Sequence, residues 1–101
     1  MERKIILSKR ASKKLDKLLL YLETEWSEKV KKDFIYKLDR ALNILKNNPR
    51  SSPESKQSPG IHQCVVTKQT TIFYRFDRMK IYIISVFDSR QDPKKLKKEL
   101  K

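Results

Sequence analysis

The spacing of apolar residues changes along the chain, and each change marks a different structural element. A short apolar run over residues 5–7 suits a β-strand. Apolar residues then recur every three or four positions over residues 11–26 and again over residues 30–45, which predicts two amphipathic helices. Ser8 and Ser27 stand just before these helices and are the expected N-caps. The connection between the helices is so short that we expect an antiparallel helix hairpin.

A long polar segment follows the second helix. The helix is expected to end at Asn47-Asn48-Pro49, where an asparagine can adopt a left-handed conformation and proline cannot continue the helix. Residues 49–60 contain three of the four prolines and the only glycine, so they are expected to form a loop. A loop of about a dozen residues is unusual in a small domain, which raises the question of what it does.

Beyond the loop the pattern becomes that of β-strands. β-branched and aromatic residues dominate residues 61–67, 71–76 and 80–87, and the short polar connections between them predict an antiparallel meander. The last strand is apolar on both faces and is therefore expected to be central, with the helices over one face and a tail or a partner over part of the other. Strict alternation predicts that Ile81, Ile83, Ser85 and Phe87 share one face and that Tyr82, Ile84, Val86, Asp88 and Arg90 share the other.

Composition narrows the partners and excludes two kinds of site. Lysine and arginine number 25 against 12 aspartates and glutamates, which gives a net charge of +13 and favours a polyanionic partner such as nucleic acid, an anionic membrane surface or an acidic protein. With Cys64 as the sole cysteine and a single histidine, an internal disulfide and a Cys/His zinc site are impossible, and we expect no metal and no cofactor.

No stretch approaches the roughly 18 apolar residues of a membrane span, and the first apolar run is too short for a signal peptide. We therefore expect a cytoplasmic protein without a membrane partner. The chain shows no internal repeat, and residues 1–101 are expected to form a single domain.

The order of these elements on so basic a chain resembles the RelE/ParE superfamily of bacterial type II toxins, over nearly the whole length. The motifs that carry the resemblance are EWS at residues 25–27, NP at 48–49, VVTK at 65–68, FYRF at 73–76 and VFDSRQDP at 86–93. The resemblance implies an α/β fold, more narrowly α+β, in which a helix hairpin packs on a small twisted antiparallel sheet and a basic tail follows. It also implies a cognate acidic antitoxin that wraps the toxin and neutralises it.

The superfamily has two activities, and the residues leave both open. RelE-like members cleave messenger RNA on the ribosome, whereas ParE-like members poison DNA gyrase without breaking bonds themselves. Metal-free RNA cleavage needs a base, an acid and cations that stabilise the negatively charged transition state. The resemblance places Arg75 and Arg90 at basic positions that RelE-like nucleases use on phosphate.

Asp88 is the third candidate catalytic residue. It stands with Ser89 where RelE-like nucleases carry a histidine or tyrosine, and an aspartate of ordinary pKa, about 3.9, can act as a base but is a poor acid at neutral pH. An ion pair between Asp88 and Arg90 that fastens the strand end is the structural alternative. Further phosphate contacts are expected at Lys56, Lys68, Lys94 and Lys95.

These residues lead to one hypothesis about a site and three about function. We expect the end of the last strand to form the floor of a cationic cleft, with Arg75 beside Arg90 across the sheet and Lys68 in the turn beside Arg75. The first functional interpretation is a toxin that blocks translation by ribosome-dependent messenger RNA cleavage. The alternatives are a gyrase poison that acts by binding alone and a basic RNA-binding domain without toxicity.

Overall fold

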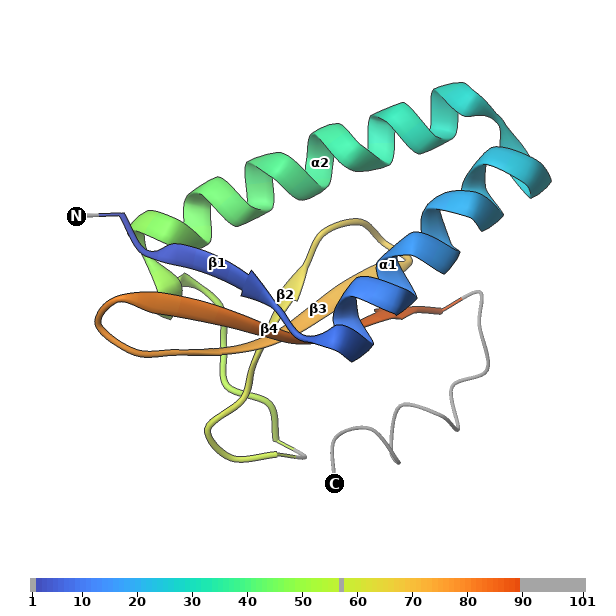
Figure 1. Ribbon diagram of the computed structural model, residues 1–101. Helices are drawn as coiled ribbons and strands as arrows, with labels where there is room; N and C mark the ends of the chain where they lie inside the picture. The colour runs from blue at the N-terminus through green and yellow to red at the C-terminus, as the bar shows by residue number, and fades with distance from the viewer. Residues whose placement is uncertain (1, 57, 90–101) are drawn as a thin grey trace.

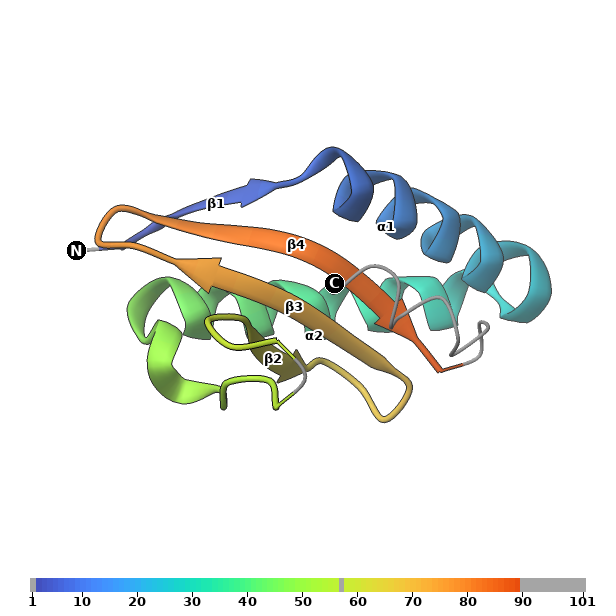
Figure 2. The ribbon, with the colours of Figure 1, turned by 90° about the horizontal axis from the view of Figure 1, so that it is seen from below.

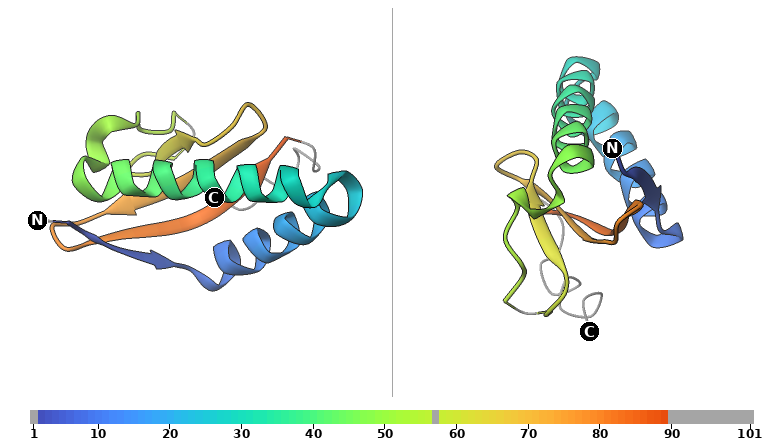
Figure 3. Two further views of the ribbon diagram at one scale, coloured as in Figure 1. Left: turned by 90° about the horizontal axis from the view of Figure 1, so that it is seen from above. Right: turned by 90° about the vertical axis from the view of Figure 1, so that its left-hand side faces the viewer.

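The computed structural model describes residues 2–56 and 58–89, which form two layers, a pair of helices on one face of a four-stranded sheet (Figure 1). Figure 3 shows the sheet nearly edge-on, with both helices on the same side of it. This architecture confirms the predicted α+β fold and the order β-α-α-β-β-β. The elements are β1 (Lys4–Leu7), α1 (Lys9–Tyr21), α2 (Glu28–Asn47), β2 (His62–Val65), β3 (Thr70–Phe76) and β4 (Lys80–Asp88).

Both predicted N-caps are present. The backbone N–H of Ala11 donates to Ser8 Oγ at 3.0 Å, and that of Val30 donates to Ser27 Oγ at 3.1 Å. The predicted end of α2 is only partly right, because Asn48 has a φ of −146° and no described residue other than glycine has a positive φ. Proline instead ends the helix by starting a 3-10 turn, Pro49–Ser51.

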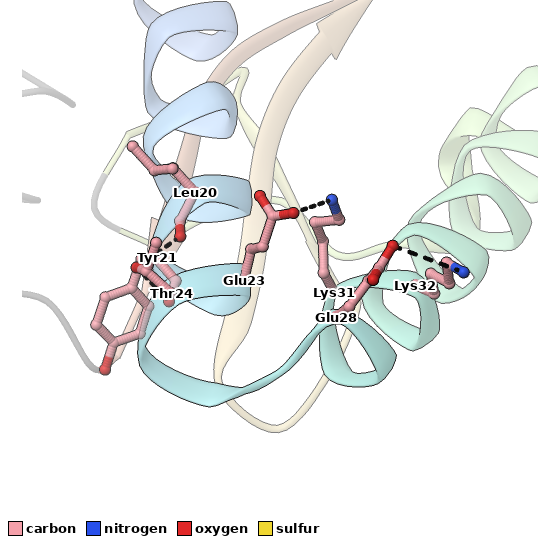
Figure 4. A network of polar contacts seen from close by, with 7 residues as sticks. All are labelled: Leu20, Tyr21, Glu23, Thr24, Glu28, Lys31 and Lys32. Carbon is pink, nitrogen blue, oxygen red and sulfur yellow. Dashed lines mark hydrogen bonds and ion pairs between the residues drawn. The ribbon is translucent and has the colours of Figure 1, made fainter.

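The two helices are joined by a π-helical turn, Leu22–Trp26, which the sequence pattern did not reveal. The N–H of Ser27 donates to the carbonyl oxygen of Leu22 at 2.9 Å, the five-residue spacing that defines a π-helix. Figure 4 shows the polar contacts around this turn, in which Thr24 Oγ1 donates to the carbonyl oxygen of Leu20 and Lys31 pairs with Glu23 at 3.1 Å. The wider turn reverses the chain, so α1 and α2 form the expected hairpin.

The strand order is β1-β4-β3-β2, which places β4 inside the sheet as predicted. β2, β3 and β4 form the expected antiparallel meander. β1, however, pairs with β4 in parallel, with Lys4 opposite Lys80 and Leu7 opposite Ile83. The sheet is therefore mixed rather than wholly antiparallel.

A β-bulge in β4 corrects the predicted alternation of that strand. Phe73 pairs with Ser85 while Tyr74 pairs with Ile83, so Ile84 is an extra residue without a partner in β3. Ser8 accounts for its position, because the Ser8 hydroxyl donates to the carbonyl oxygen of Ile84 at 2.9 Å.

Beyond the bulge the two faces of β4 are exchanged. Ile81 and Ile83 therefore share the helix-facing side with Val86 and Asp88, and not with Ser85 and Phe87 as predicted. The buried core between helices and sheet consists of Ala11, Leu18, Leu22, Phe34, Leu45, Ile72, Tyr74, Ile81, Ile83 and Val86.

The long loop before β2 is attached to the edge of the sheet. The N–H of Gln63 donates to the carbonyl oxygen of Pro53 at 3.0 Å, and Glu54 forms an isolated bridge with His62. Gly60, whose φ is 86°, donates its N–H to the Glu54 carboxylate at 2.6 Å. The loop thus has a structural role, since it covers backbone groups of an edge strand that would otherwise be open to pairing. Neither described helix has the length and apolar character needed to span a membrane.

Candidate functional site

The structure separates the residues that the sequence placed in one cleft. Asp88 pairs with Thr70 at one end of β3, whereas Arg75 pairs with Tyr82 near the other end. The five residue-to-residue steps from Thr70 to Arg75 along an extended strand correspond to about 17 Å. Alternation also puts Arg75 on the face opposite to Asp88, because Tyr74 and Phe76 on either side of Arg75 pack toward the core. The predicted juxtaposition of Arg75 with the end of β4 is therefore wrong.

Asp88 is a buried residue in this fold. Its side chain is 1% exposed, and Thr70 Oγ1 donates to Asp88 Oδ2 at 2.8 Å. A general base must reach the proton that it removes, and the Asp88 carboxylate points into the protein instead. The expectation that Asp88 lies on the floor of an open cleft is contradicted.

The lysines predicted to join Arg75 in the cleft also lie in other parts of the molecule. Lys68 is exposed in the β2–β3 turn, close to the end of β4, where the N–H of Ser89 donates to the carbonyl oxygen of Gln69 at 2.7 Å. It therefore lies at the far end of β3 from Arg75, contrary to the prediction. Lys56 is exposed in the loop beside β2. Arg90, Lys94 and Lys95 lie outside the described residues.

A different set of cations gathers at the β3–β4 turn. The start of β1, the end of α2 and this turn lie at the same end of the molecule (Figures 1 and 2). The guanidinium carbons of Arg3 and Arg50 lie 5.7 Å and 5.6 Å from the centroid of the Phe76 ring, and that of Arg75 lies 5.5 Å from the centroid of the Tyr82 ring. We call the set of Arg3, Arg50, Arg75, Arg78 and Lys80 the cationic turn surface. It spans both sides of the sheet at this end, because Phe76 packs toward the helices whereas Arg75 and Tyr82 lie on the opposite side.

Asp77, the acid in this turn, stays ionised and interacts electrostatically with Lys80, but among the described residues it forms no ion pair with an arginine of the surface. Asp77 Oδ1 accepts the N–H groups of Met79 and Lys80, each at 2.8 Å, and these bonds hold the pKa of Asp77 below its ordinary value. The hydroxyl of Tyr82 donates to the other carboxylate oxygen at 3.3 Å. Arg3 reaches Asp77 only at its backbone, where Arg3 Nε donates to the carbonyl oxygen at 2.8 Å. The hydrogen bonds hold the carboxylate in the turn, where its negative charge offsets one of the positive charges of the surface.

Arg3 and Arg50 could not be found from the sequence pattern, for a physical reason. Arg3 comes near the turn only because β1 adds in parallel to β4, which a local pattern cannot show. Arg50 is placed by the 3-10 turn, which is fastened to the sheet by the hydrogen bond from the Tyr74 hydroxyl to the carbonyl oxygen of Pro49 at 2.6 Å. The one signal in the sequence was Pro49, which ends α2 and starts the turn that carries Arg50.

A groove of about 170 Å³ lies at the other end of the molecule, between the start of α2 and the β2–β3 turn. Its apolar lining comes from Leu22, Val30 and Phe34. Its polar lining comes from Asp33, Lys37, Thr67 and Gln69. We call this the α2 groove; it has the mixed lining that suits a peptide with an apolar anchor and charged neighbours.

The described residues offer little to a metal or a nucleophilic mechanism. No group of three or more histidine, cysteine, aspartate or glutamate side chains within residues 2–56 and 58–89 is placed to hold a metal ion. Burial raises the pKa of the Cys64 thiol, which disfavours the reactive thiolate. What the structure presents is a pair of candidate binding surfaces, one cationic and one partly apolar.

Comparisons with known proteins agree with this architecture. A family model described as "ParE toxin of type II toxin-antitoxin system, parDE" matches residues 5–93. Among solved structures, the chain is similar to the chromosomal ParDE toxin–antitoxin system of P. aeruginosa, with a TM-score of 0.68 and 14% identity over 86% of this chain and 96% of that one. No curated protein sequence matches.

Two further structures from E. coli have the same fold. A mutant of the toxin RelE in the free state gives a TM-score of 0.65 with 15% identity over 99% of this chain and 95% of that one. The DinJ-YafQ toxin–antitoxin complex gives a TM-score of 0.60 with 16% identity over 89% and 96% of the respective chains. At these identities the likeness establishes the fold alone.

Proposed function

The chain belongs to the ParE toxin family of type II toxin–antitoxin systems, and from that premise we propose that it poisons DNA gyrase by binding, without breaking a bond itself. Family membership makes the chain the toxin of such a system. The mode of action is the proposal. RelE-like cleavage of messenger RNA on the ribosome is the competing mode.

The position of Asp88 is the observation that carries this choice. Cleavage requires an acid and a base within hydrogen-bond reach of the reacting phosphate, beside the cations that stabilise it. Asp88, the candidate base, is buried and bonded to Thr70, and it lies on the face opposite to Arg75. Binding to a protein target requires no such assembly.

We also propose that the α2 groove receives the antitoxin. Related solved structures include the ParDE system and the DinJ-YafQ toxin–antitoxin complex. The net charge of +13 favours an acidic partner, and the apolar floor of the groove suits an apolar side chain from it. The partner segment would carry an apolar anchor flanked by acids that face Lys37.

We also propose which basic residues contact the target. Arg75 is exposed on the cationic turn surface and is a proposed contact. Arg90, Lys94 and Lys95 follow β4 in the sequence and lie outside the described residues. We propose them as further contacts with the target. Lys56 and Lys68 lie apart from Arg75, so they would serve separate contacts.

The test is to induce the protein in bacteria and follow the incorporation of labelled thymidine and labelled methionine within minutes. In parallel, purified protein is added to a gyrase supercoiling assay. We expect DNA synthesis to fall before translation and supercoiling to be inhibited, with both effects weakened by Arg75→Gln. If translation falls first and messenger RNA is cut, the cleavage mode replaces this proposal. If neither falls, the protein is not a toxin of this kind.

A further inference from the structure

We propose that the cationic turn surface binds the phosphate backbone of double-stranded DNA, with Arg3 and Arg50 as its central contacts. The choice of a duplex over a single strand rests on the geometry of this surface. The choice of DNA over duplex RNA rests on the proposed function, because gyrase acts on DNA.

Two like charges converge on one aromatic ring of this surface. Arg3 precedes β1 and Arg50 follows α2, yet both guanidinium groups lie within 6 Å of the centroid of one ring, that of Phe76. A cation over an aromatic face is attracted to it, which offsets part of the repulsion between the two arginines. An anion beside this ring would be attracted to both guanidinium groups, so the arrangement is suited to a phosphate.

The guanidinium groups of this surface are available to a ligand. Within the part of the chain that the structure describes, no ion pair joins a carboxylate to Arg3, Arg50 or Arg75. Asp77, the acid in the turn, accepts backbone N–H groups and the Tyr82 hydroxyl, and its charge acts on Lys80. Guanidinium groups present several N–H donors in a plane, the geometry that matches phosphate oxygens.

The aromatic rings of this surface favour a duplex over a single strand as the ligand. Proteins that hold single strands stack the bases on aromatic side chains, so they need exposed rings. Here the rings are already occupied: Arg3 and Arg50 lie over Phe76, and Arg75 lies over Tyr82. Tyr74 is fully buried. What remains for a ligand is the guanidinium groups, Arg3 and Arg50 at Phe76 and Arg75 on the other side of the sheet end, which suit backbone phosphates rather than bases.

Two pairs of cations allow a matched comparison. Arg3→Gln with Arg50→Gln removes two charges from the cationic turn surface. Lys13→Gln with Lys17→Gln removes two charges from the exposed side of α1. If binding reflects the net charge alone, the two double variants weaken it equally; if the surface is a site, only the arginine variant does so strongly.

The experiment measures fluorescence anisotropy of a labelled DNA duplex titrated with the full chain at several salt concentrations. Duplex RNA and single-stranded DNA of the same sequence serve as separate probes. We expect the arginine variant to bind about tenfold or more weakly and to reduce the slope of log K against log salt by about two, one for each phosphate that is no longer neutralised. The lysine variant is expected to change affinity less than about threefold.

Arg3→Lys with Arg50→Lys serves as the folding control, because it keeps the charges while removing the planar donors. Its affinity should lie between that of the parent and that of the glutamine variant. The site would be overturned if Arg3→Gln with Arg50→Gln and Lys13→Gln with Lys17→Gln weakened binding equally. Tighter binding to single-stranded DNA than to the duplex would overturn it as well. Equal binding of duplex RNA would overturn the choice of DNA. Because the assay contains no gyrase, its failure and the failure of gyrase poisoning are separate results.

Discussion

Asp88 shows how the environment of a single side chain decides its role. A polar residue at the end of an apolar strand is typical both of an active site and of a buried hydrogen bond. The bulge at Ile84 shifts the alternation of β4 so that Asp88 faces the core, opposite Thr70, with 1% of its side chain exposed. The same residue without that shift would lie on the other face of the sheet.

Thr70→Val tests the buried bond. Valine keeps the shape of threonine but removes the donor to a buried carboxylate, which is expected to lower the free energy of unfolding by about 1–3 kcal/mol. Thr71→Val, at the neighbouring position on the opposite face, is the control and should change it by less than about 0.5 kcal/mol. Urea unfolding followed by circular dichroism measures both. Equal effects would mean that the bond adds nothing of its own.

Asp77 gives a prediction about pH. Its pKa is lowered by the N–H groups of Met79 and Lys80, so its contribution to the turn is present above the unfolded pKa of about 3.9 and is lost as the pH falls through the lower folded pKa. In an NMR titration, the amide protons of Met79 and Lys80 should shift with a midpoint below that of an ordinary aspartate. Asp77→Asn should abolish the transition. A midpoint at or above about 3.9 would contradict the lowered pKa.

At the scale of elements, Ser8 fastens a helix to a strand. Its Oγ accepts the N–H of Ala11, which caps α1, and its hydroxyl donates to the carbonyl oxygen of Ile84 at the bulge of β4. Its N–H donates to the carbonyl oxygen of Ile83 at 3.0 Å. One residue therefore fixes both the start of α1 and the irregularity of β4.

Comparing Ser8→Ala with Ser27→Ala separates these two roles. Ser27 caps α2 by accepting the N–H of Val30, so Ser27→Ala should lower the free energy of unfolding by about 0.5–2 kcal/mol, the usual cost of losing a helix cap. Ser8→Ala removes a cap and also the bond to Ile84, and its cost should exceed that of Ser27→Ala by about 1 kcal/mol. Urea unfolding of both variants gives the difference. If Ser27→Ala is as costly as Ser8→Ala, the bond to the bulge is without net effect.

Periodicity predicted the elements well because each helix and strand is a local pattern. The N-caps at Ser8 and Ser27 were correct for the same reason. Two features were beyond a local reading. The bulge falls at Ile84, an apolar residue among apolar neighbours, and the parallel addition of β1 joins segments far apart in the chain. The bulge places Asp88 and the parallel addition of β1 places Arg3, so neither position followed from a local pattern. The predicted contact of Arg75 with the end of β4 failed for another reason: the short β3–β4 turn pairs Arg75 with Tyr82, a register that the spacing in the sequence already implied.

At the scale of the whole molecule, the two candidate binding surfaces lie at opposite ends. The cationic turn surface is built from the start of β1, the 3-10 turn and the β3–β4 turn, whereas the α2 groove lies between the start of α2 and the β2–β3 turn. The net charge of +13 acts on any acidic partner at long range and speeds its approach. To distinguish specific binding from general attraction, two variants must have the same net charge but carry the changed residue at different places.

Lys37→Glu makes that distinction for the antitoxin. Lys37 is exposed at the lining of the α2 groove, so reversing its charge should repel an acidic segment there and weaken antitoxin binding by about tenfold or more. Lys29→Glu, exposed on α2 but outside the groove lining, changes the net charge equally and should weaken binding less than about threefold.

Titration calorimetry against the purified antitoxin measures both affinities, and growth arrest on induction reports toxicity. Because the cationic turn surface is untouched, both variants should stay toxic, and antitoxin should rescue growth of the Lys29→Glu strain better. Equal weakening by the two variants would mean that the antitoxin senses overall charge and binds elsewhere.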